Sequence, residues 1–337
     1  MAIYSQGQRN SSHPYSGRIR AMLASAGNRS DPVAAIVERA SRLVAESGLS
    51  HPPFSPNIYA QLRNVGQIVE SDIKIDGRLV PSPPTFTIEL RRDRPFQRKN
   101  FTCAHEVAHT FFTAFPSLTT RGVYLSPEPD AMEETLCNLA AAELLMPKEF
   151  ITAVGTDYEP RPESFLEIAS LFGTSLSATA IRLMKLKIWN VGFVMWSIEN
   201  GTLVPRWICK RTGMFTHRPS LGILNANSSS VFQTLKTGER TSDWEYLQTS
   251  SGLWPCYIQS VRLNSQRGLS MVSSSIQARA PGIRHKRSPL PLVMNYHCRC
   301  AGTGWILQKE RGHTVASRCL AKTHNETALR TKTEVPS

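Results

Sequence analysis

Two histidines four residues apart, with a glutamate directly after the first, occur in the stretch Phe101-Thr-Cys-Ala-His-Glu-Val-Ala-His-Thr-Phe-Phe112. Residues four apart lie on one face of an α-helix, so the imidazoles of His105 and His109 can converge on a single ion. Zinc suits such a pair, and a catalytic zinc has three protein ligands and keeps its fourth position for water, whose pKa it lowers. Glu106 is placed to act on that water as general base and to carry the proton to a leaving amine. The spacing therefore predicts a zinc site that cleaves peptide bonds.

A third ligand is available further along the chain, where a second helical stretch begins with Met132-Glu-Glu-Thr-Leu-Cys-Asn138. A carboxylate at the start of one helix that meets two histidines of another is a common arrangement in zinc peptidases. Glu133 and Glu134 are both candidates, and spacing alone does not choose between them. A purely structural explanation would need three separate partners for the two histidines and the glutamate, because burying them unpaired costs free energy.

Two helices are predicted to carry these residues. The segment from Arg98 to Ala114 has the length of a helix, and a second helix is predicted from about Asp130 to Leu145, where Met146-Pro147 stops it. A loop rich in proline and serine, Pro116 to Pro129, separates the two. The sequence thus predicts a pair of helices that share one metal site.

The region ahead of this pair contains one clear helix, a short helical stretch near Ile58 to Val65 and two strand-like runs. Asp31-Pro32 opens the helix, because Asp can cap it and Pro suits its first turn, and Gly48 closes it. Residues 67–75 and 85–90 are typical of β-strands, and turn signals that include the Pro81–Pro84 segment separate them. We expect a small sheet before the active-site helix.

Both site motifs closely resemble those of the ImmA/IrrE family of metallo-endopeptidases. The stretch Arg98-Lys-Asn-Phe-Thr-Cys-Ala-His-Glu-Val-Ala-His109 is similar to the family's Arg-x-x-Phe-Thr-x-Ala-His-Glu-x-x-His. The stretch Glu134-Thr-Leu-Cys-Asn-Leu-Ala-Ala-Ala-Glu-Leu-Leu-Met-Pro147 is similar to its Glu-x-x-Ala-Asn-x-Phe-Ala-Ala-x-Leu-Leu-Met-Pro. Aligning these motifs places the family's ligand glutamate on Glu134. Cys137 and Ala140 depart from the family's usual Ala and Phe, and we interpret both as packing positions that affect core shape rather than chemistry.

The resemblance covers roughly residues 35–187 and implies an α+β fold with a helical zincin-like metallopeptidase core and a small β-sheet. It also implies Zn2+ as cofactor, His105, His109 and Glu134 as its ligands, and Glu106 as the catalytic base. Members of the family cut cytoplasmic repressor proteins in bacteria and their mobile elements, which relieves repression of stress or transfer genes. The expectation is therefore a cytoplasmic metallo-endopeptidase in transcription regulation and stress response, with a transcriptional repressor as its protein substrate.

In some relatives the core is followed by a helix-turn-helix segment and a sensory domain that resembles GAF. Here residues 167–183 resemble the middle segment, with two helices around a glycine-containing turn. A DNA-reading second helix needs exposed basic or amide side chains, and this one carries only Arg182, Lys185 and Lys187. Packing support for the zincin core is the favoured role, and direct DNA binding is the alternative.

After Asn190 the sequence changes to short strand-like runs at 191–198, 203–208, 256–263 and 304–308. We therefore expect five parts: 1–30, a disordered basic tail; 31–160, the zinc metallopeptidase domain; 161–188, the helix-turn-helix-like segment; 189–320, a β-rich C-terminal domain, for which a GAF-like fold is one option; and 321–337, a disordered tail.

The composition is that of a soluble globular protein with a basic charge. The 39 Lys and Arg residues outnumber the 26 Asp and Glu residues and give a formal charge of +13, which favours an anionic partner, although their scatter does not indicate specific DNA reading. Neither a secretion signal nor an apolar run near the roughly 18 residues that cross a bilayer is predicted. Seven cysteines, spread along the chain, suit a reducing cytosol better than a disulfide framework.

Two further residue groups are weaker candidates for chemistry. The stretch His297-Cys-Arg-Cys300, with His313 and Cys319, is a candidate for a second metal site, but its Cys-x-Cys spacing is tighter than usual, and strand residues or a free thiol pair explain it better. Tyr124, between the two ligand helices, is a candidate donor to the oxyanion of the scissile carbonyl, with a surface tyrosine as the alternative.

Basic residues at 91–94 and 98–99 predict a solvated rim just before the active-site helix, which can attract an acidic substrate segment. The rival to a peptidase is a non-catalytic regulatory protein that uses the zincin fold and the C-terminal domain to hold a repressor or DNA. The basic charge, the helix-turn-helix outline and the long second domain favour this rival.

Overall fold

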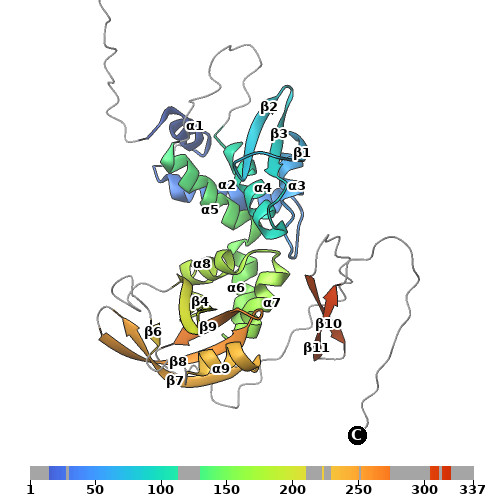
Figure 1. Ribbon diagram of the computed structural model, residues 1–337. Helices are drawn as coiled ribbons and strands as arrows, with labels where there is room; N and C mark the ends of the chain where they lie inside the picture. Colours follow the sequence, from blue (N-terminus) through green and yellow to red (C-terminus); the bar gives the residue numbers. More distant parts are fainter. Residues whose placement is uncertain are drawn as a thin grey trace, which may run out of the picture. The chain divides into compact units, whose positions relative to one another are not determined.

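The structure of the protein is a computed structural model (Figure 1). It describes residues 15–27, 30–112, 130–209, 222–223, 229–249, 252–273, 304–310 and 313–319. The chain divides into two compact units, Met1–Arg284 and His285–Ser337. The first unit contains the sequence motifs of the predicted site.

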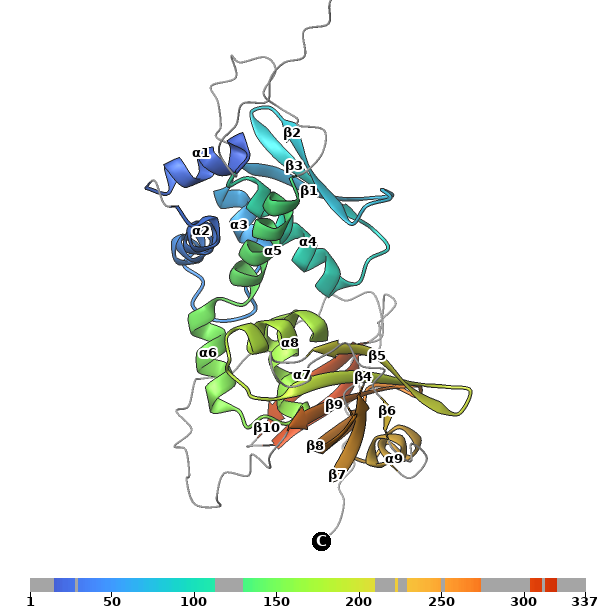
Figure 2. The ribbon, with the colours of Figure 1, turned by 90° about the vertical axis from the view of Figure 1, so that its left-hand side faces the viewer.

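Five helices form the part of the first unit that surrounds the motifs: α1 (Gly17–Ser25), α2 (Pro32–Glu46), α3 (Pro56–Leu62), α4 (Phe96–His109) and α5 (Ala131–Leu145). Helix α2 begins as predicted, since the Val33 N–H donates to Asp31 Oδ1 at 2.9 Å and Pro32 occupies its first turn. Helix α5 begins in the same way, because the Met132 N–H donates to Asp130 Oδ1 at 2.8 Å. Helices α4 and α5 lie against each other, as Figure 2 shows.

Helix α1 falls within the range for which we predicted a disordered tail, and for these nine residues that prediction is wrong. Its first turn is capped by Ser16, whose hydroxyl accepts from the Ile19 N–H. Ile19, Met22 and Leu23 are buried in the main hydrophobic core, and their spacing places them on one side of the helix. Three apolar residues are enough to dock this short helix, but their signal is weak among the surrounding Ser, Arg and Gly.

A three-stranded sheet precedes α4, with the order β1–β3–β2: β1 (Val65–Ser71) pairs parallel with β3 (Thr85–Arg91), and β2 (Gly77–Ser82) pairs antiparallel with β3. The predicted strands at 67–75 and 85–90 correspond to β1 and β3. Strand β2 was not predicted, because we interpreted Pro81 as part of a turn. Since β2 is an edge strand, it accommodates a residue without an N–H group.

Helices α6 (Lys148–Asp157), α7 (Pro162–Leu171) and α8 (Leu176–Lys185) follow, and α7 and α8 form the predicted helix-turn-helix outline. Gly173 lies in their turn with a φ of +63°, a conformation that glycine adopts without strain. No single helix among the described residues is long and apolar enough to cross a membrane. The pair α7 and α8 passes that test only together, with a bend of 103°, and its apolar side chains, such as Phe165 and Leu183, are buried in the core.

Arg182 on α8 was one of three basic residues considered for DNA contacts, and the structure removes it from that role. Its side chain is buried and forms an ion pair with the equally buried Glu143 of α5. Its Nε also donates to the Met146 carbonyl at 3.0 Å, and Glu143 accepts from Ser41 Oγ at 3.1 Å. The second helix is thus tied to the core by its own basic residue.

A six-stranded antiparallel sheet forms the rest of the first unit, with the strand order β5–β4–β9–β8–β7–β6. Its elements are β4 (Gly192–Glu199), β5 (Thr202–Cys209), β6 (Gly222–Ile223), α9 (Ser230–Thr237), β7 (Thr241–Thr249), β8 (Gly252–Arg262) and β9 (Arg267–Ser273). The predicted strands at 191–198, 203–208 and 256–263 correspond to β4, β5 and β8. Strands β6, β7 and β9 and helix α9 were not predicted.

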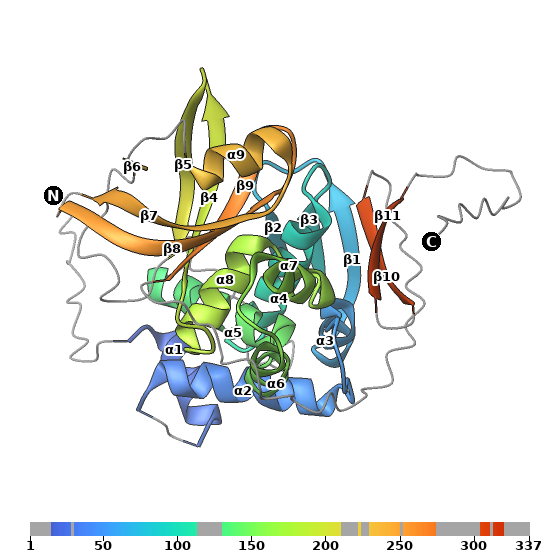
Figure 3. The same cartoon turned by 90° about the horizontal axis from the view of Figure 1, so that it is seen from below.

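The two faces of this sheet are covered by different helices, as Figure 3 shows. Phe193 of β4 and Met271 of β9 belong to the main core, which also contains residues of α7 and α8. The next residues along the same strands, Val194 and Val272, pack instead in a second cluster with α9. Because successive side chains of a strand point to opposite faces of the sheet, the same strands contribute residues to both hydrophobic clusters.

The second unit contains a hairpin of β10 (Gly304–Glu310) and β11 (His313–Cys319), in which Glu310 pairs with His313 and Gly304 with Cys319. His313 and Cys319 stand at opposite ends of β11, so their backbones are roughly 20 Å apart. They do not come together as the candidate second metal site would require, and residues 297–300 lie outside the described residues.

Candidate metal centre

Helices α4 and α5 bring together the three side chains for which zinc ligation was predicted. Glu134 Oε2 lies 3.1 Å from His105 Nε2, and Glu134 Oε1 lies 3.3 Å from His109 Nε2. The two Nε2 atoms are themselves 3.1 Å apart. One carboxylate and two imidazoles from two helices thus face a common point.

These separations fit a single zinc ion. Ligands at about 2.0–2.1 Å from a tetrahedral zinc lie roughly 3.3 Å from one another, which is the spacing of the three groups. Their surroundings also favour a cation, because Glu106 and Glu133 are buried close by on the same two helices. The donor set therefore suits zinc in a site with three protein ligands.

Each histidine is oriented by a hydrogen bond from its other ring nitrogen. His105 Nδ1–H donates to Asn138 Oδ1 at 3.1 Å, and His109 Nδ1–H donates to Glu133 Oε1 at 3.1 Å. An ionised carboxylate only accepts hydrogen bonds, so Glu133 fixes the tautomer of His109 and leaves the Nε2 lone pair for a metal. Glu133, which spacing left open as a ligand, lies on the outer side of His109.

Arg18 of α1 completes this arrangement. Its Nη2 lies 3.0 Å from Glu133 Oε1, the same oxygen that accepts from His109. Glu133 is almost fully buried, whereas the Arg18 side chain is 40% exposed. Nothing in the sequence pointed to this contact, because it depends on how α1 docks.

Glu106, the predicted base, is buried on α4 beside the ligand histidines. Burial raises the pKa of its carboxyl group to about 7, and the Leu79 N–H of strand β2 donates a hydrogen bond to it. A carboxyl group that titrates near neutral pH can both accept and release a proton during a reaction cycle.

The two histidines have opposite pKa shifts when no metal is bound. Burial, followed by the repulsion of His109, lowers the pKa of His105. Burial also acts to lower the pKa of His109, but hydrogen bonds with Cys137, Glu133 and Glu134 outweigh it and raise that pKa to about 12. The hydrogen bond from His109 lowers the pKa of Glu134.

Cys137, which we interpreted as a packing position, lies against the ligand histidines. Its Sγ and one ring nitrogen from each of His105 and His109 all lie within 4.8 Å of one another. That limit is looser than the roughly 3.3–3.7 Å expected between nitrogen and sulfur ligands of one zinc. Glu134, at 3.1 and 3.3 Å, fits the third position better.

The C-terminal end of α4 is held firmly just beyond His109. Arg63 donates to the Thr110 carbonyl at 2.9 Å and to its Oγ1 at 3.0 Å, while Arg39 donates to the Phe111 carbonyl at 2.8 Å. Both guanidinium groups also lie over the Phe111 ring, at 5.3 and 5.8 Å from its centroid. Two cations at the helix C-terminus complement its dipole and restrain the second ligand.

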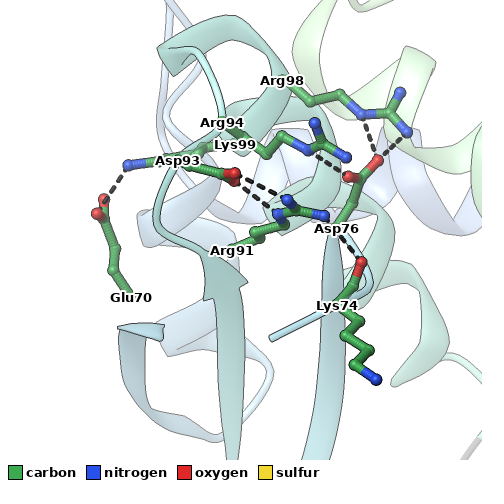
Figure 4. A network of polar contacts seen from close by, with 8 residues as sticks. All are labelled: Glu70, Lys74, Asp76, Arg91, Asp93, Arg94, Arg98 and Lys99. Atoms are coloured by element: carbon green, nitrogen blue, oxygen red, sulfur yellow. Dashed lines mark hydrogen bonds and ion pairs between the residues drawn. The ribbon is translucent and has the colours of Figure 1, made fainter. Parts of the chain in front are cut away.

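The predicted basic rim is largely paired with acidic side chains, as Figure 4 shows. Arg94 Nε and Arg98 Nε donate to the two oxygens of Asp76 at 2.7 and 2.8 Å. Arg91 donates to Asp93, and Lys99 lies 2.7 Å from Glu70. These contacts connect the small sheet to the first turn of α4, and they leave less free positive charge than the sequence alone indicates. Tyr124, the other predicted site residue, lies outside the described residues.

The helix pair with its histidines and glutamate, next to a small sheet, has the arrangement of a zincin-like core. Residues 70–184 match the family model of the IrrE N-terminal-like domain, Peptidase_M78. This segment therefore contains an IrrE N-terminal-like domain, and the resemblance of the two motifs to the ImmA/IrrE family is confirmed.

Two curated relatives are radiation response metalloproteases IrrE. The chain is 37% identical over 76 residues to the protein of Deinococcus deserti and 30% identical over 89 residues to that of Deinococcus radiodurans. These matches span 22% and 26% of this chain and 27% of each relative. A solved structure of a Mycobacterium tuberculosis transcriptional regulator aligns over 79% of this chain and 98% of its own, with 13% identity and a TM-score of 0.44.

Proposed function

We propose that the protein is a zinc-dependent endopeptidase of the ImmA/IrrE type. The observation that carries this proposal is the convergence of His105 Nε2, His109 Nε2 and the Glu134 carboxylate within 3.1 to 3.3 Å of one another. The buried Glu106 carboxyl group next to them supplies the remaining group that the reaction requires.

His105, His109 and Glu134 would hold the ion, and Asn138 and Glu133 would keep the two imidazoles in position. Bound zinc would polarise the scissile carbonyl and lower the pKa of water. The Glu106 carboxylate would accept, at one of its oxygens, a proton from the water that attacks the scissile carbonyl. It would then pass this proton to the nitrogen of the leaving amine. Its pKa of about 7 supports both halves of this transfer.

The substrate we propose is a cytoplasmic regulatory protein, a transcriptional repressor. Support comes from the resemblance of the two motifs to the ImmA/IrrE family, whose members cut repressors, and the two curated relatives are named radiation response metalloproteases. The six-stranded sheet behind α7 and α8 would then serve as a regulatory domain, in which a sensory role resembling that of GAF domains is our proposal. The matched segments cover 27% of each relative, and the activity of the whole chain is likewise our proposal.

The experiment compares metal content and cleavage in purified variants. Glu106→Gln is expected to keep one zinc per chain and to lose cleavage of repressors encoded near its gene, as read by mass spectrometry. His105→Ala is expected to lose both, and Glu38→Gln, on the exposed side of α2, is the matched control that should change neither. Cleavage by Glu106→Gln at the wild-type rate would overturn the mechanism.

A non-catalytic binding protein is the second candidate, favoured by an exposed aromatic face on the C-terminal sheet. Trp244 and Tyr246 on β7 are 46% and 53% exposed, and Leu253 on β8 is 47% exposed. A protein partner held at this face without any bond being cut would appear in the same experiment as binding of an intact repressor. DNA is the less favoured partner, since Arg182 is buried.

A further inference from the structure

Three side chains form a line from the molecular surface to the metal centre. Arg18 Nη2 lies 3.0 Å from Glu133 Oε1, and that oxygen accepts from His109 Nδ1 at 3.1 Å. One oxygen thus has a guanidinium group on one side and a ligand histidine on the other. Glu133 has no further ion pair among the described residues apart from these two.

Glu133 depends on Arg18 because of where it lies. Its side chain is 2% exposed and stands next to Glu134 on a helix whose first turn carries both carboxylates. A buried carboxylate that loses one of its two ion-pair partners is left less well compensated, so loss of Arg18 favours rotation of Glu133 toward solvent. His109 would then lose the acceptor that orients its ring.

Arg18 in turn depends on the docking of α1. The next residue, Ile19, is fully buried, and Met22 and Leu23 continue the same apolar side into the main core. Arg18 is carried by this docked helix, while Arg20 on the same helix is exposed. Helix α1 also lies outside residues 70–184, the segment that matches the family domain.

We propose that α1 is a strap on the metal centre, in which Arg18 positions Glu133 and, through it, His109. This inference rests on the proposed zinc site and goes beyond it, because it makes zinc retention depend on a helix upstream of the peptidase domain. Arg18 is a positioning residue that acts on His109 through Glu133. Coupling of this kind is reciprocal, so zinc binding stabilises the docked α1 to the same extent.

The first test measures zinc affinity by chelator competition in the full chain, at one pH. Arg18→Gln is expected to bind zinc roughly tenfold more weakly, at the lower end of the losses caused by removing outer partners of metal ligands. Arg18→Lys keeps a cation within reach of Glu133 and should stay within about threefold of wild type. Arg20→Gln removes the same charge from an exposed position of the same helix and should leave the affinity unchanged.

The second test measures hydrogen exchange of the α1 amides with and without zinc. In the wild-type chain, zinc is expected to slow exchange in residues 19–25 as well as in α4 and α5. In Arg18→Gln, the protection of α4 and α5 by zinc should remain, and that of α1 should disappear. This comparison does not depend on the overall stability of the variant, since each protein is its own control.

The outcomes separate the inference from the proposed function. An Arg18→Gln chain with unchanged or higher zinc affinity, or with α1 still protected by zinc, would overturn the strap and leave the zinc site standing. A wild-type chain that binds no zinc would overturn the proposed function, and the strap with it.

Discussion

Arg182 on α8 and Glu143 on α5 form a buried ion pair that joins the helix-turn-helix outline to the helix carrying Glu134. Both side chains are at most 10% exposed. Through this ion pair, α7 and α8 pack against the core and support it. The Arg182 side chain is therefore directed into the protein and is not available at its surface.

Replacing Arg182 should therefore affect stability first. Arg182→Ala leaves the Glu143 carboxylate buried without its cation, which is expected to lower the free energy of unfolding by about 3–5 kcal/mol. Lys185→Ala, one turn further along α8 and exposed, should change it by less than about 0.5 kcal/mol. Urea unfolding of both variants measures this, and equal stability of the two would contradict this supporting role.

Asn138 is expected to matter for metal binding rather than for folding. It is exposed, and its Oδ1 accepts from His105 Nδ1–H at 3.1 Å. Asn138→Leu removes this acceptor and should weaken zinc binding about 10- to 100-fold, whereas Asn138→Asp keeps an acceptor and should weaken it less. Chelator competition gives both affinities, and a zinc affinity in Asn138→Leu equal to that of wild type would argue against an orienting role.

Cys137 should be dispensable for the metal, despite its closeness to the histidines. Because Glu134 fits the third ligand position better, Cys137→Ala is expected to keep the zinc affinity within about threefold and to lose about 1 kcal/mol of stability from the buried site. Cobalt substitution adds a spectroscopic check, since sulfur ligation produces a strong near-ultraviolet band that oxygen and nitrogen ligands lack. Such a band in the wild-type chain that vanished in Cys137→Ala would show that sulfur binds the metal.

Asp76 should make stability depend on acid pH. Its hydrogen bond with Arg98, followed by that with Arg94, lowers the pKa of its carboxyl group, so the ionised form is favoured in the folded state. A lowered folded-state pKa contributes stability above the unfolded value of about 3.9, and this contribution is lost as the pH falls through the lowered value. Asp76→Asn should cost about 1 kcal/mol at pH 7 and progressively less below about pH 4.

The matched control for this prediction is Asp72→Asn. The Asp72 carboxylate is 83% exposed and lies 3.9 Å from Arg92, so its loss should be close to neutral at every pH. A constant difference between wild type and Asp76→Asn from pH 7 to pH 3 would show that the carboxylate charge of Asp76 does not contribute.

The parts of the fold that could be predicted are those that local sequence determines. Asp31 and Asp130 cap α2 and α5 as their positions indicated, and Pro147 follows the end of α5. The helical spacing of His105 and His109 was likewise sufficient to bring their Nε2 atoms together. In each case the relevant partners lie within a few residues along the chain.

The missed features depend on contacts between distant segments. Strand β2 is stabilised by pairing with β3. Pro81 indicated a turn there, because the sequence does not show that β2 lies at the edge of the sheet, where proline is tolerated. The role of Glu133 depends on Arg18, more than a hundred residues earlier, and the burial of Arg182 depends on Glu143. Sequence spacing contains no information about such pairs, and so neither the orienting role of Glu133 nor the Arg182–Glu143 ion pair was predicted, although packing support was the favoured role of α7 and α8.

X-ray absorption at the zinc edge would identify the atoms that bind the metal and so distinguish two imidazoles and a carboxylate from any other set of ligands. We expect one zinc per wild-type chain, with only nitrogen and oxygen neighbours at about 2.0–2.2 Å, and loss of that zinc in Glu134→Ala. A sulfur neighbour at about 2.3 Å, or a zinc that survives Glu134→Ala with the same neighbours, would contradict this expectation.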